Sequence, residues 1–313
     1  MAVEILMMGP MGPIERGLEP DFTVHKLPPE PERGSFLAEN AAGIRGIVAY
    51  SGASLVGPAF LDQLPNVEII ANMGVGYESV DVPAARARNI VVTNAGSVNA
   101  EDVGEAAFGL VLATARRIAA GDRYVRAGDW VSKGRMQMTH RVTGRKLGIL
   151  GLGHIGLAVA RRGAAFDMPV SYHNRRRRED VPYRYFPSLV DMAKEVDFLV
   201  AATPGGDETQ HLIDRAVIDA LGPEGIIVNV GRGSVIDEKE MVAALLEGRL
   251  GGAGLDVFEN EPHVPQELMA LPNVVLQPHQ GGATYEGVGA AIELVIRNLK
   301  SHFAGQGVLT PVT

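Results

Sequence analysis

Three glycines near the middle of the chain have the spacing of a dinucleotide-binding turn. Gly151, Gly153 and Gly156 form the pattern G-x-G-x-x-G within LGILGLGHIGLAVARR, between an apolar run that predicts a strand and a run of helical period. The first glycine permits a tight turn, the second lets a pyrophosphate approach the backbone, and the third lets helix and strand pack closely. The N–H groups at the start of the helix, at His154 and Ile155, favour phosphate. The alternative is an ordinary glycine-rich turn, but its position between strand and helix favours a dinucleotide site.

The strand after this turn ends in a basic segment. A site for NAD usually places Asp or Glu there, about 20 residues on, to bind the ribose 2′-hydroxyl. This chain has Asn174, Arg175 and Arg176 at that point, followed by Arg177 and Arg178. A guanidinium group forms charge-assisted, often bidentate hydrogen bonds with phosphate. We therefore expect the first three residues to bind the 2′-phosphate of NADP(H), NAD(H) to bind more weakly, and Arg177 and Arg178 to face solvent. The alternative is a solvated turn without a ligand.

Three later segments place polar residues directly after predicted strands. They contain Arg232 in NVGRG, Glu261 in DVFENEP and His279 in QPHQGGAT. Because the carboxyl ends of parallel strands border the ligand crevice of a doubly wound sheet, these side chains can converge. Taken singly, each of these three residues also has a plain structural interpretation. Glu259, two positions before Glu261, is an alternative candidate for the functional carboxylate of its segment.

Together with GLGHIG, these segments resemble the D-isomer-specific 2-hydroxyacid dehydrogenases, in particular the branch of NADPH-linked glyoxylate, hydroxypyruvate and hydroxyphenylpyruvate reductases. The resemblance is carried by the stretches ALGPEGIIVNVGRGSVIDEKEMVAALLEGRLGGAGLDVFENEP and PNVVLQPHQGGAT. It covers roughly residues 45–300, and the first 40 residues show no match.

The resemblance implies that the protein reduces a 2-oxo acid by hydride transfer. His279 is then the proton donor, because imidazolium can protonate a developing alkoxide near neutral pH. Glu261, which precedes proline as the family's acid does, keeps this histidine protonated and oriented. Arg232 holds the substrate's carboxylate and carbonyl oxygens with its planar fork. Gly282 departs from the family pattern, since relatives commonly carry a serine hydroxyl at this position.

The same resemblance implies further cofactor contacts. They are made by Thr203, Val230, Arg232, Asp256, His279 and Gly281, in addition to the residues of the glycine turn and the basic strand end. No metal site is expected.

A second glycine-containing loop lies in the first third of the chain. The sequence NMGVGYESVD follows a predicted strand, and its backbone N–H groups can form an anion-binding nest. We therefore expect Val75 and Gly76 to bind the substrate carboxylate, alongside Arg232 and His279. The alternative is an ordinary turn capped by Asp81. The loop of residues 50–54 is expected to line the same cleft.

Apolar runs alternate with segments of helical period along most of the chain. The predicted strands include residues 44–50, 67–71, 90–93, 147–150, 169–172, 197–202, 225–230, 252–255 and 274–276, and another strand is expected at the N-terminus. This alternation predicts an α/β fold of two Rossmann-like domains, each a doubly wound parallel sheet, with an interdomain cleft. A long helical pattern at 101–128 and a last helix at about 284–303 link the domains. We expect residues 1–99 and 285–313 to form a discontinuous substrate-binding domain, and residues 100–284 to form the dinucleotide-binding domain.

The composition limits the class of protein. The chain has 313 residues, 46% of them hydrophobic, which is ample for two cores. A net charge of -8 argues against nucleic-acid and anionic-membrane partners, and no apolar run is long enough to span a bilayer. Cysteine is absent, which excludes disulfides and thiolate chemistry and fits a cytoplasmic protein. Trp130 and the segment Met136–Met138 lie where this family reaches a second subunit, so a homodimer is expected; core packing is the alternative.

Two other functions fit the sequence less well than reduction of a 2-oxo acid. A nucleotide-sensing Rossmann regulatory protein would not need the proton donor His279. Formate dehydrogenases of this family carry Gln where Glu261 stands, which disfavours formate oxidation. The size of the substrate pocket is not determined by these motifs, so glyoxylate, hydroxypyruvate, 2-ketogluconate and arylpyruvates all stay open.

Overall fold

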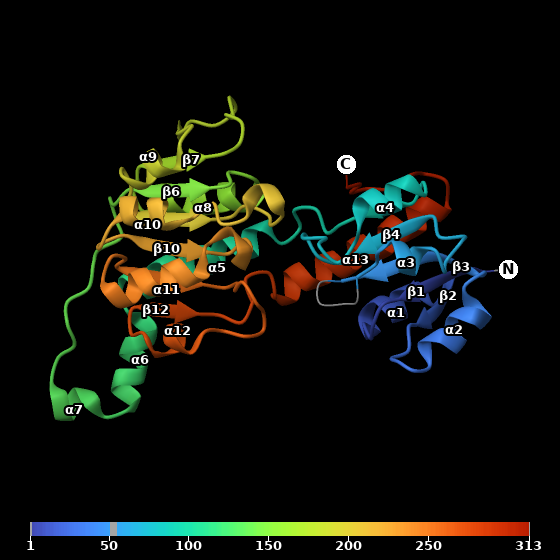
Figure 1. Ribbon diagram of the computed structural model, residues 1–313, viewed down its shortest axis with the longest axis horizontal. Helices are drawn as coiled ribbons and strands as arrows, with labels where there is room; N and C mark the ends of the chain where they lie inside the picture. Colours follow the sequence, from blue (N-terminus) through green and yellow to red (C-terminus); the bar gives the residue numbers. More distant parts are fainter. Residues whose placement is uncertain (1, 51–54, 313) are drawn as a thin grey trace. The chain divides into compact units, whose positions relative to one another are not determined.

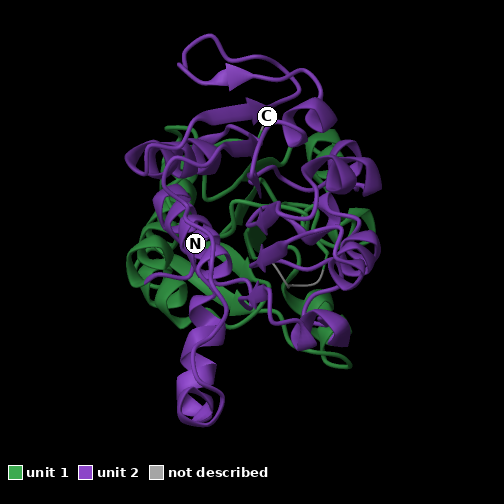
Figure 2. Ribbon diagram, turned by 90° about the vertical axis from the view of Figure 1, so that its left-hand side faces the viewer, with its two compact units in different colours: residues 1–99, 285–313 green, residues 100–284 purple. Residues whose placement is uncertain are grey.

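A computed structural model describes residues 2–50 and 55–312, and they divide into two compact units (Figures 1 and 2). Unit 1 comprises Met1–Asn99 and Tyr285–Thr313, and unit 2 comprises Ala100–Thr284. The assignment of unit 1 to the substrate and unit 2 to the dinucleotide stays a prediction, as does a cleft between them. The predicted residues 51–54 lie outside the described part of the chain.

Unit 1 is an α/β unit around a parallel sheet in the order β2-β1-β3-β4-β5. Its elements are β1 (Val3–Met7), α1 (Gly12–Leu18), β2 (Phe22–Lys26), α2 (Arg33–Asn40), β3 (Ile44–Ala49), α3 (Pro58–Leu61), β4 (Ile69–Asn72), α4 (Val82–Ala87), β5 (Val91–Thr93) and α13 (Tyr285–Phe303).

Unit 2 has a larger parallel sheet in the order β12-β11-β10-β9-β6-β7-β8. Its elements are α5 (Ala100–Ala115), α6 (Ile118–Arg126), α7 (Asp129–Lys133), β6 (Leu147–Leu150), α8 (His154–Ala165), β7 (Val170–His173), β8 (Arg184–Tyr185), α9 (Leu189–Ala193), β9 (Phe198–Ala201), η1 (Asp207–Thr209), α10 (Arg215–Leu221), β10 (Ile226–Asn229), η2 (Gly233–Val235), α11 (Glu238–Glu247), β11 (Gly252–Leu255), α12 (Gln266–Ala270) and β12 (Val274–Leu276). No helix within the described ranges is long and apolar enough to cross a membrane.

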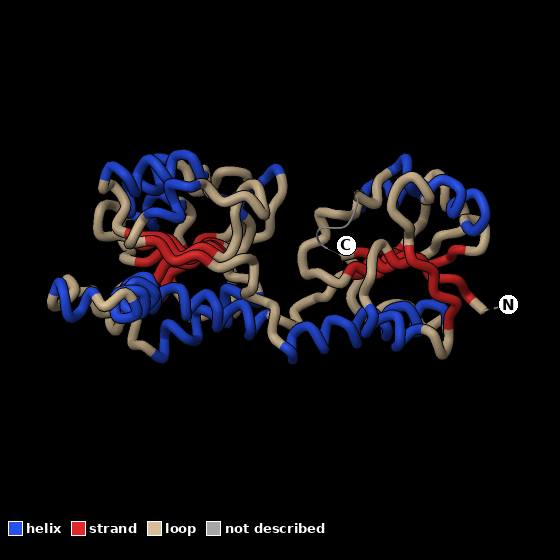
Figure 3. The backbone as a smooth tube through the Cα atoms, turned by 90° about the horizontal axis from the view of Figure 1, so that it is seen from below, coloured by secondary structure: helices blue, strands red, loops and turns tan. Residues whose placement is uncertain are grey.

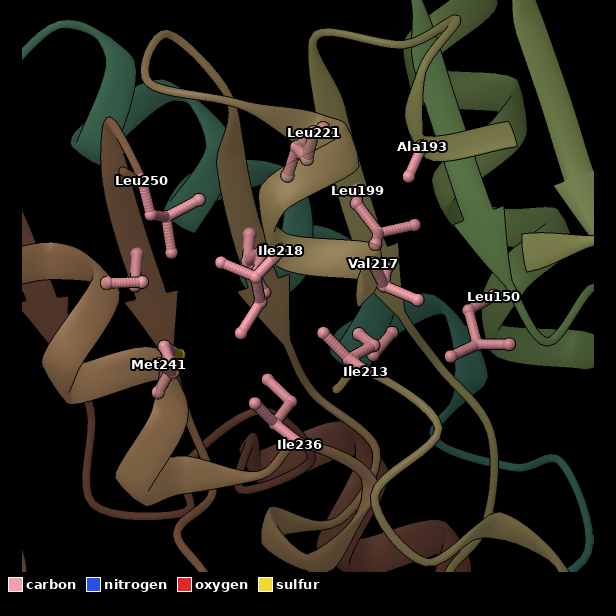
Figure 4. Close-up of a cluster of buried hydrophobic side chains, with 14 of the residues drawn as sticks. Leu150, Ala193, Leu199, Ile213, Val217, Ile218, Leu221, Ile236, Met241 and Leu250 are labelled. Carbon is pink, nitrogen blue, oxygen red and sulfur yellow. The ribbon is translucent and has the colours of Figure 1, made fainter. Parts of the chain in front are cut away.

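In each unit the sheet lies between layers of helices (Figure 3). Successive strand residues point to opposite faces, so each strand contributes to two cores. In unit 2, Leu199 and Ile227 face the core beneath α9–α12, while Val200 and Val228 face the core beneath α5 and α8. Figure 4 shows the first of these cores, where Ile218 of α10 lies among the other buried aliphatic side chains. The predicted fold class, α/β with two doubly wound parallel sheets, is confirmed.

Two strands were not expected from the sequence, and both lie at sheet edges. β2 has the sequence FTVHK with only Phe22 fully buried, and β8 has only two residues. An edge strand pairs on one side only and tolerates polar side chains, so neither strand shows the apolar run that marks the central strands.

The prediction of one continuous helical pattern over residues 101–128 is wrong. α5 ends at Ala115, and Arg117 has a φ of +50°, in the left-handed region that stops a helix. α5 buries one face against the sheet and α8, whereas α6 has no fully buried residue. The break therefore coincides with the point where the chain leaves the core.

Two adjacent leucines of α11 test the core assignment. Leu245 is 5% exposed in the core beneath α9–α12, whereas Leu246 is 59% exposed. We expect Leu245→Ala to lower the free energy of unfolding by about 2–5 kcal/mol, because it removes buried apolar area and leaves a cavity. Leu246→Ala should change it by no more than about 0.5 kcal/mol. Urea unfolding followed by circular dichroism gives both values, and equal effects would contradict the packing described here.

Candidate active site

The glycine turn joins β6 to α8 where the strand order of unit 2 reverses, the usual ligand position in doubly wound sheets. Gly151 has a φ of +94°, which side chains with a Cβ rarely adopt. A Cβ on Gly156 would lie 2.2 Å from the carbonyl oxygen of Gly151, so helix and turn pack too closely for alanine. A Cβ on Gly153 would meet nothing within 4 Å, which leaves open space beside the backbone. The turn fits a pyrophosphate on this evidence.

The first residues of α8 can contribute mainly through their backbone. His154 is exposed at the helix start, and the Ile155 side chain packs against the core of unit 2. Their N–H groups lie in the first turn of the helix, where the helix dipole favours an anion.

The segment that follows β7 forms hydrogen bonds with the backbone of Leu152, within the glycine turn. Asn174 Oδ1 accepts a hydrogen bond from the Leu152 N–H at 2.6 Å, and Arg178 Nη1 donates to the Leu152 carbonyl at 2.9 Å. The prediction that Arg178 faces solvent is wrong. Its backbone N–H donates to the Tyr172 hydroxyl at 2.8 Å, and this bond turns the chain back toward the glycine turn. Asp180 pairs with Arg178, which lowers the pKa of the Asp180 carboxyl.

Arg175 and Arg176 remain exposed at the surface beside β7. The Arg175 side chain is 78% exposed and forms an ion pair with Glu208, which lies in η1 after β9. Arg177 is also exposed, as expected, and pairs with Glu179 at 3.3 Å. The residues of the basic segment after β7 therefore have two structural roles. Asn174 and Arg178 hold the glycine turn, whereas the side chains of Arg175 and Arg176 are exposed to solvent.

The loops after β6, β9 and β10 are in close contact at the same edge of the sheet. A Cβ on Gly151 would lie 2.8 Å from Thr203 N, and a Cβ on Gly231 would lie 2.4 Å from Thr203 O. Val230 is 5% exposed in the core, so a cofactor could reach only its backbone. Thr203 therefore lies against the glycine turn and is the more accessible of the two predicted residues, whereas Val230 precedes Gly231 in the loop after β10.

Asp256, which follows β11, shapes the histidine loop. Its buried carboxylate accepts the Gln280 N–H at 2.7 Å and the Gly281 N–H at 2.8 Å, and its carbonyl accepts the His279 N–H at 2.8 Å. A Cβ on Gly281 would lie 2.7 Å from Asp256 Oδ2, which explains the glycine. His279 has a φ of +54°, an uncommon conformation that these bonds maintain. Asp256 was expected to contact the cofactor, but both carboxylate oxygens bond this loop.

His279 and Glu261 form the predicted pair. His279 Nδ1 lies 2.8 Å from Glu261 Oε2, and Glu261 Oε1 accepts the Phe258 N–H at 3.0 Å. The two side chains are 43% and 35% exposed. With Nδ1 donating to the carboxylate, Nε2 is the ring atom from which a proton can be delivered.

The rival acid Glu259 has a histidine partner of its own. His211 Nε2 lies 2.9 Å from Glu259 Oε1, while the Glu259 N–H donates to Glu238. The pKa of the Glu238 carboxyl is raised, chiefly by burial. The bond from the Glu259 N–H opposes this shift, and the nearby Glu259 charge adds to it. The choice of Glu261 over Glu259 as partner of His279 agrees with this geometry.

Arg232 lies between β10 and η2, and its backbone is held by buried Asn229. Asn229 Nδ2 donates to the Arg232 carbonyl at 2.9 Å, and Asn229 Oδ1 accepts the Gly231 N–H at 3.0 Å. The guanidinium Nη1 donates to the Gly231 carbonyl at 2.7 Å. A Cβ on Gly205 would lie 3.1 Å from Arg232 Cγ, so the side chain runs against the loop after β9.

The predicted nest lies in unit 1, directly after β4. In the described part of the chain, no hydrogen-bond acceptor is assigned to the N–H groups of Val75 and Gly76, as an anion site requires. Their carbonyls accept bonds from Asn94 and Asn72 respectively. No group of three or more His, Asp or Glu side chains suited to a metal ion occurs in the described ranges.

Sequence reasoning missed several residues that position this site. They are Asn72, Asn94, Glu208, His211 and Asn229. A usable signal exists for the asparagines, because each stands at the carboxyl end of a strand, where a small amide can bond the loop that follows. Glu208 and His211 lie in a polar loop without such a signal.

Comparison with known proteins identifies the family of this chain. A family model for the D-isomer specific 2-hydroxyacid dehydrogenase, NAD binding domain, matches residues 108–281. The chain is 44% identical to a glyoxylate/hydroxypyruvate reductase A of Arabidopsis thaliana and 46% identical to a hydroxyphenylpyruvate reductase of Plectranthus scutellarioides, over 99% of each chain in both cases.

Among solved structures, an NADPH-dependent glyoxylate/hydroxypyruvate reductase from Sinorhizobium meliloti in complex with NADP and malonate is 40% identical, with a TM-score of 0.93. The match covers 100% of this chain and 97% of that one. The similarity thus includes the first 40 residues. No match was expected there from the sequence, because a β-α-β segment without chemical motifs offers little to recognise. The chain therefore belongs to the D-isomer specific 2-hydroxyacid dehydrogenase family and is an oxidoreductase.

Proposed function

We propose that this protein reduces a small 2-oxo acid of the glyoxylate or hydroxypyruvate kind to the D-2-hydroxy acid, with NADPH as the reductant. The observation that carries the proposal is the 2.8 Å bond between His279 and Glu261, at the carboxyl edge of the sheet that also bears the glycine turn. The names of the relatives support the substrate class. A nucleotide sensor would have no use for such a pair.

A nicotinamide cofactor held by the glycine turn would supply the hydride for the carbonyl carbon. His279 would deliver the proton to the carbonyl oxygen from Nε2, while Glu261 stabilises the protonated ring and fixes its orientation. Arg232 would bind the substrate oxygens and keep the carbonyl in line for transfer. The N–H groups of Val75 and Gly76 would bind the carboxylate.

Cofactor preference is assigned to the exposed arginines after β7. Arg175 and Arg176 would bind the 2′-phosphate of NADP(H), and NAD(H), which lacks this group, would bind more weakly. Arg175 pairs with Glu208 in the structure, so the phosphate would replace that carboxylate. The open side of the turn at Gly153 would receive the pyrophosphate.

The assembly we propose is a cytoplasmic homodimer. The absence of cysteine fits a reducing compartment. The segment of α6 and α7 has no fully buried residue, yet it carries exposed apolar side chains, with Trp130 at 62% and Val131 at 95% exposure. Met138, just beyond it, is 98% exposed. Exposed apolar groups concentrated on one segment indicate an interface, and a second copy of the chain is the partner proposed.

The function is tested by NADPH oxidation with a panel of 2-oxo acids: glyoxylate, hydroxypyruvate, 2-ketogluconate and hydroxyphenylpyruvate. We expect turnover with the first two, and His279→Ala should lower kcat by about 10²–10⁴-fold because it removes the proton donor. Glu261→Gln removes the charge that stabilises the protonated ring, so the rate of reduction should begin to fall at a lower pH than in wild type.

Glu259→Gln serves as the control for this pair, since Glu259 bonds His211 instead, and its pH profile should match wild type. No turnover with any acid of the panel would reject the reductase and favour a binding protein. Turnover confined to hydroxyphenylpyruvate or 2-ketogluconate would change the substrate class.

Cofactor preference is tested with Arg175→Ala. Loss of a charge-assisted contact worth about 1.5–3 kcal/mol should weaken NADPH binding by about 10- to 150-fold and leave NADH binding nearly unchanged. Arg177→Ala, another exposed arginine of the same run, is the matched control. Fluorescence titration measures both dissociation constants. Wild-type preference for NADH, or equal loss of both cofactors, would overturn the assignment.

The interface is tested with Trp130→Glu. A charge placed in an apolar interface should shift the protein from dimer to monomer, measured by analytical ultracentrifugation. Met269→Glu is the control, because Met269 is 59% exposed on α12 and outside the proposed interface. A monomeric wild type, or a dimer that survives in Trp130→Glu, would contradict the proposal.

A further inference from the structure

Asn72, the last residue of β4, is fully buried and bonds the loop that follows it. Its Nδ2 atom donates to the carbonyl of Gly74 at 2.9 Å and to the carbonyl of Gly76 at 2.8 Å. One side chain therefore holds two carbonyls of the predicted nest.

Asn94, just after β5, bonds the carbonyl between these two. Its Nδ2 atom donates to the Val75 carbonyl at 2.7 Å, and the neighbouring Ala95 N–H donates to the Gly74 carbonyl at 2.9 Å. Two asparagines from different strand ends thus hold three consecutive carbonyls of one loop.

The direction of these carbonyls determines the direction of the N–H groups. In a trans peptide the C=O and N–H bonds point in opposite directions. The peptide that carries the Gly74 carbonyl also carries the Val75 N–H, and the Val75 carbonyl is paired in the same way with the Gly76 N–H. Holding the carbonyls of Gly74 and Val75 against the protein therefore turns both N–H groups away from it.

Asn72 is chemically unusual for a buried residue. Its Oδ1 atom has no hydrogen-bond partner among the residues that the structure describes, although the side chain is 0% exposed. A buried acceptor without a partner destabilises a fold by about 1–3 kcal/mol. The two donor hydrogens of the amide are used and its oxygen is not, so the residue is better explained by positioning of the loop than by stability.

Asn94 is held in turn by the C-terminal segment of the chain. The Thr310 hydroxyl donates to the Asn94 carbonyl at 2.7 Å and accepts a bond from Asn298 Nδ2 at 3.0 Å. Asn298 is 1% exposed on α13, and its Oδ1 accepts the Leu309 N–H at 2.8 Å. The C-terminal segment is therefore bonded to the residue that holds the Val75 carbonyl.

We propose that Asn72 and Asn94 are positioning residues that orient the N–H groups of Val75 and Gly76 toward the substrate carboxylate. Thr310 supports them by holding Asn94. This inference rests on the proposed function, in which the nest binds a 2-oxo acid.

The test measures carboxylate binding separately from catalysis. Oxalate, a small carboxylate without a reducible carbonyl, is titrated calorimetrically into the NADPH-bound protein. We expect Asn72→Ala and Asn94→Ala to weaken oxalate binding by about 5- to 15-fold, the effect of losing about one hydrogen bond. KM for glyoxylate should rise with little change in kcat, and NADPH binding should stay within about twofold of wild type.

Asn66→Ala is the matched control, because Asn66 Nδ2 donates to the Ala42 carbonyl at 2.8 Å in the same unit, away from the nest. Thr310→Val removes the hydroxyl and should weaken oxalate binding, whereas Thr310→Ser keeps it and should restore binding. This second comparison applies even if Asn72→Ala fails to fold. A general loss of structure would lower kcat and the folded fraction without a selective change in oxalate affinity.

The positioning role is wrong if the asparagine variants bind oxalate as tightly as Asn66→Ala, or if wild type does not bind oxalate. A wild type that binds oxalate but reduces no 2-oxo acid would instead reject the proposed function. In that case the comparison of oxalate affinities still supports or overturns the positioning role.

Discussion

The arrangement of unit 2 depends on close contact between the loops that leave one edge of its parallel sheet. Parallel pairing places all the carboxyl ends together, but the loops can meet only where no Cβ intervenes. A Cβ on Gly233 would lie 1.9 Å from the Phe258 carbonyl carbon, and a Cβ on Gly231 would lie 2.4 Å from the Thr203 carbonyl oxygen. These contacts connect the loops after β9, β10 and β11, from which Arg232 and Glu261 project.

A second constraint recurs at the strand ends of both units. A small polar side chain stands where the strand stops and bonds the backbone of a nearby loop. These residues are Asn72 at the end of β4, Asn174 after β7, Asn229 at the end of β10 and Asp256 after β11. Buried backbone groups need partners, and a side chain anchored in the sheet supplies them with fixed geometry. The rigidity of the sheet is thereby transferred to loops that would otherwise have many conformations.

This device separates the residues that we propose to do chemistry from those that place them. His279 and Glu261 are both partly exposed, while Asp256, which sets the conformation of the His279 loop, is 2% exposed. Arg232 is half-buried and relies on Asn229, which is 1% exposed. The charge of an active residue can therefore stay accessible without mobility of its backbone, because the support is protected from water.

The sequence by itself determined the alternation of strands and helices and the glycine turn, since these depend on local spacing. It also placed Arg232, Glu261 and His279 after predicted strands, where the carboxyl-end rule for parallel sheets lets them converge, whereas their proposed roles came from the family resemblance. It did not reveal the edge strands β2 and β8, the break at Arg117 or the inward direction of Arg178, because each follows from what surrounds the segment. Only the tertiary structure showed that Thr310 bonds Asn94, 216 residues away in the chain, because no periodicity or motif records a contact between elements so distant in sequence.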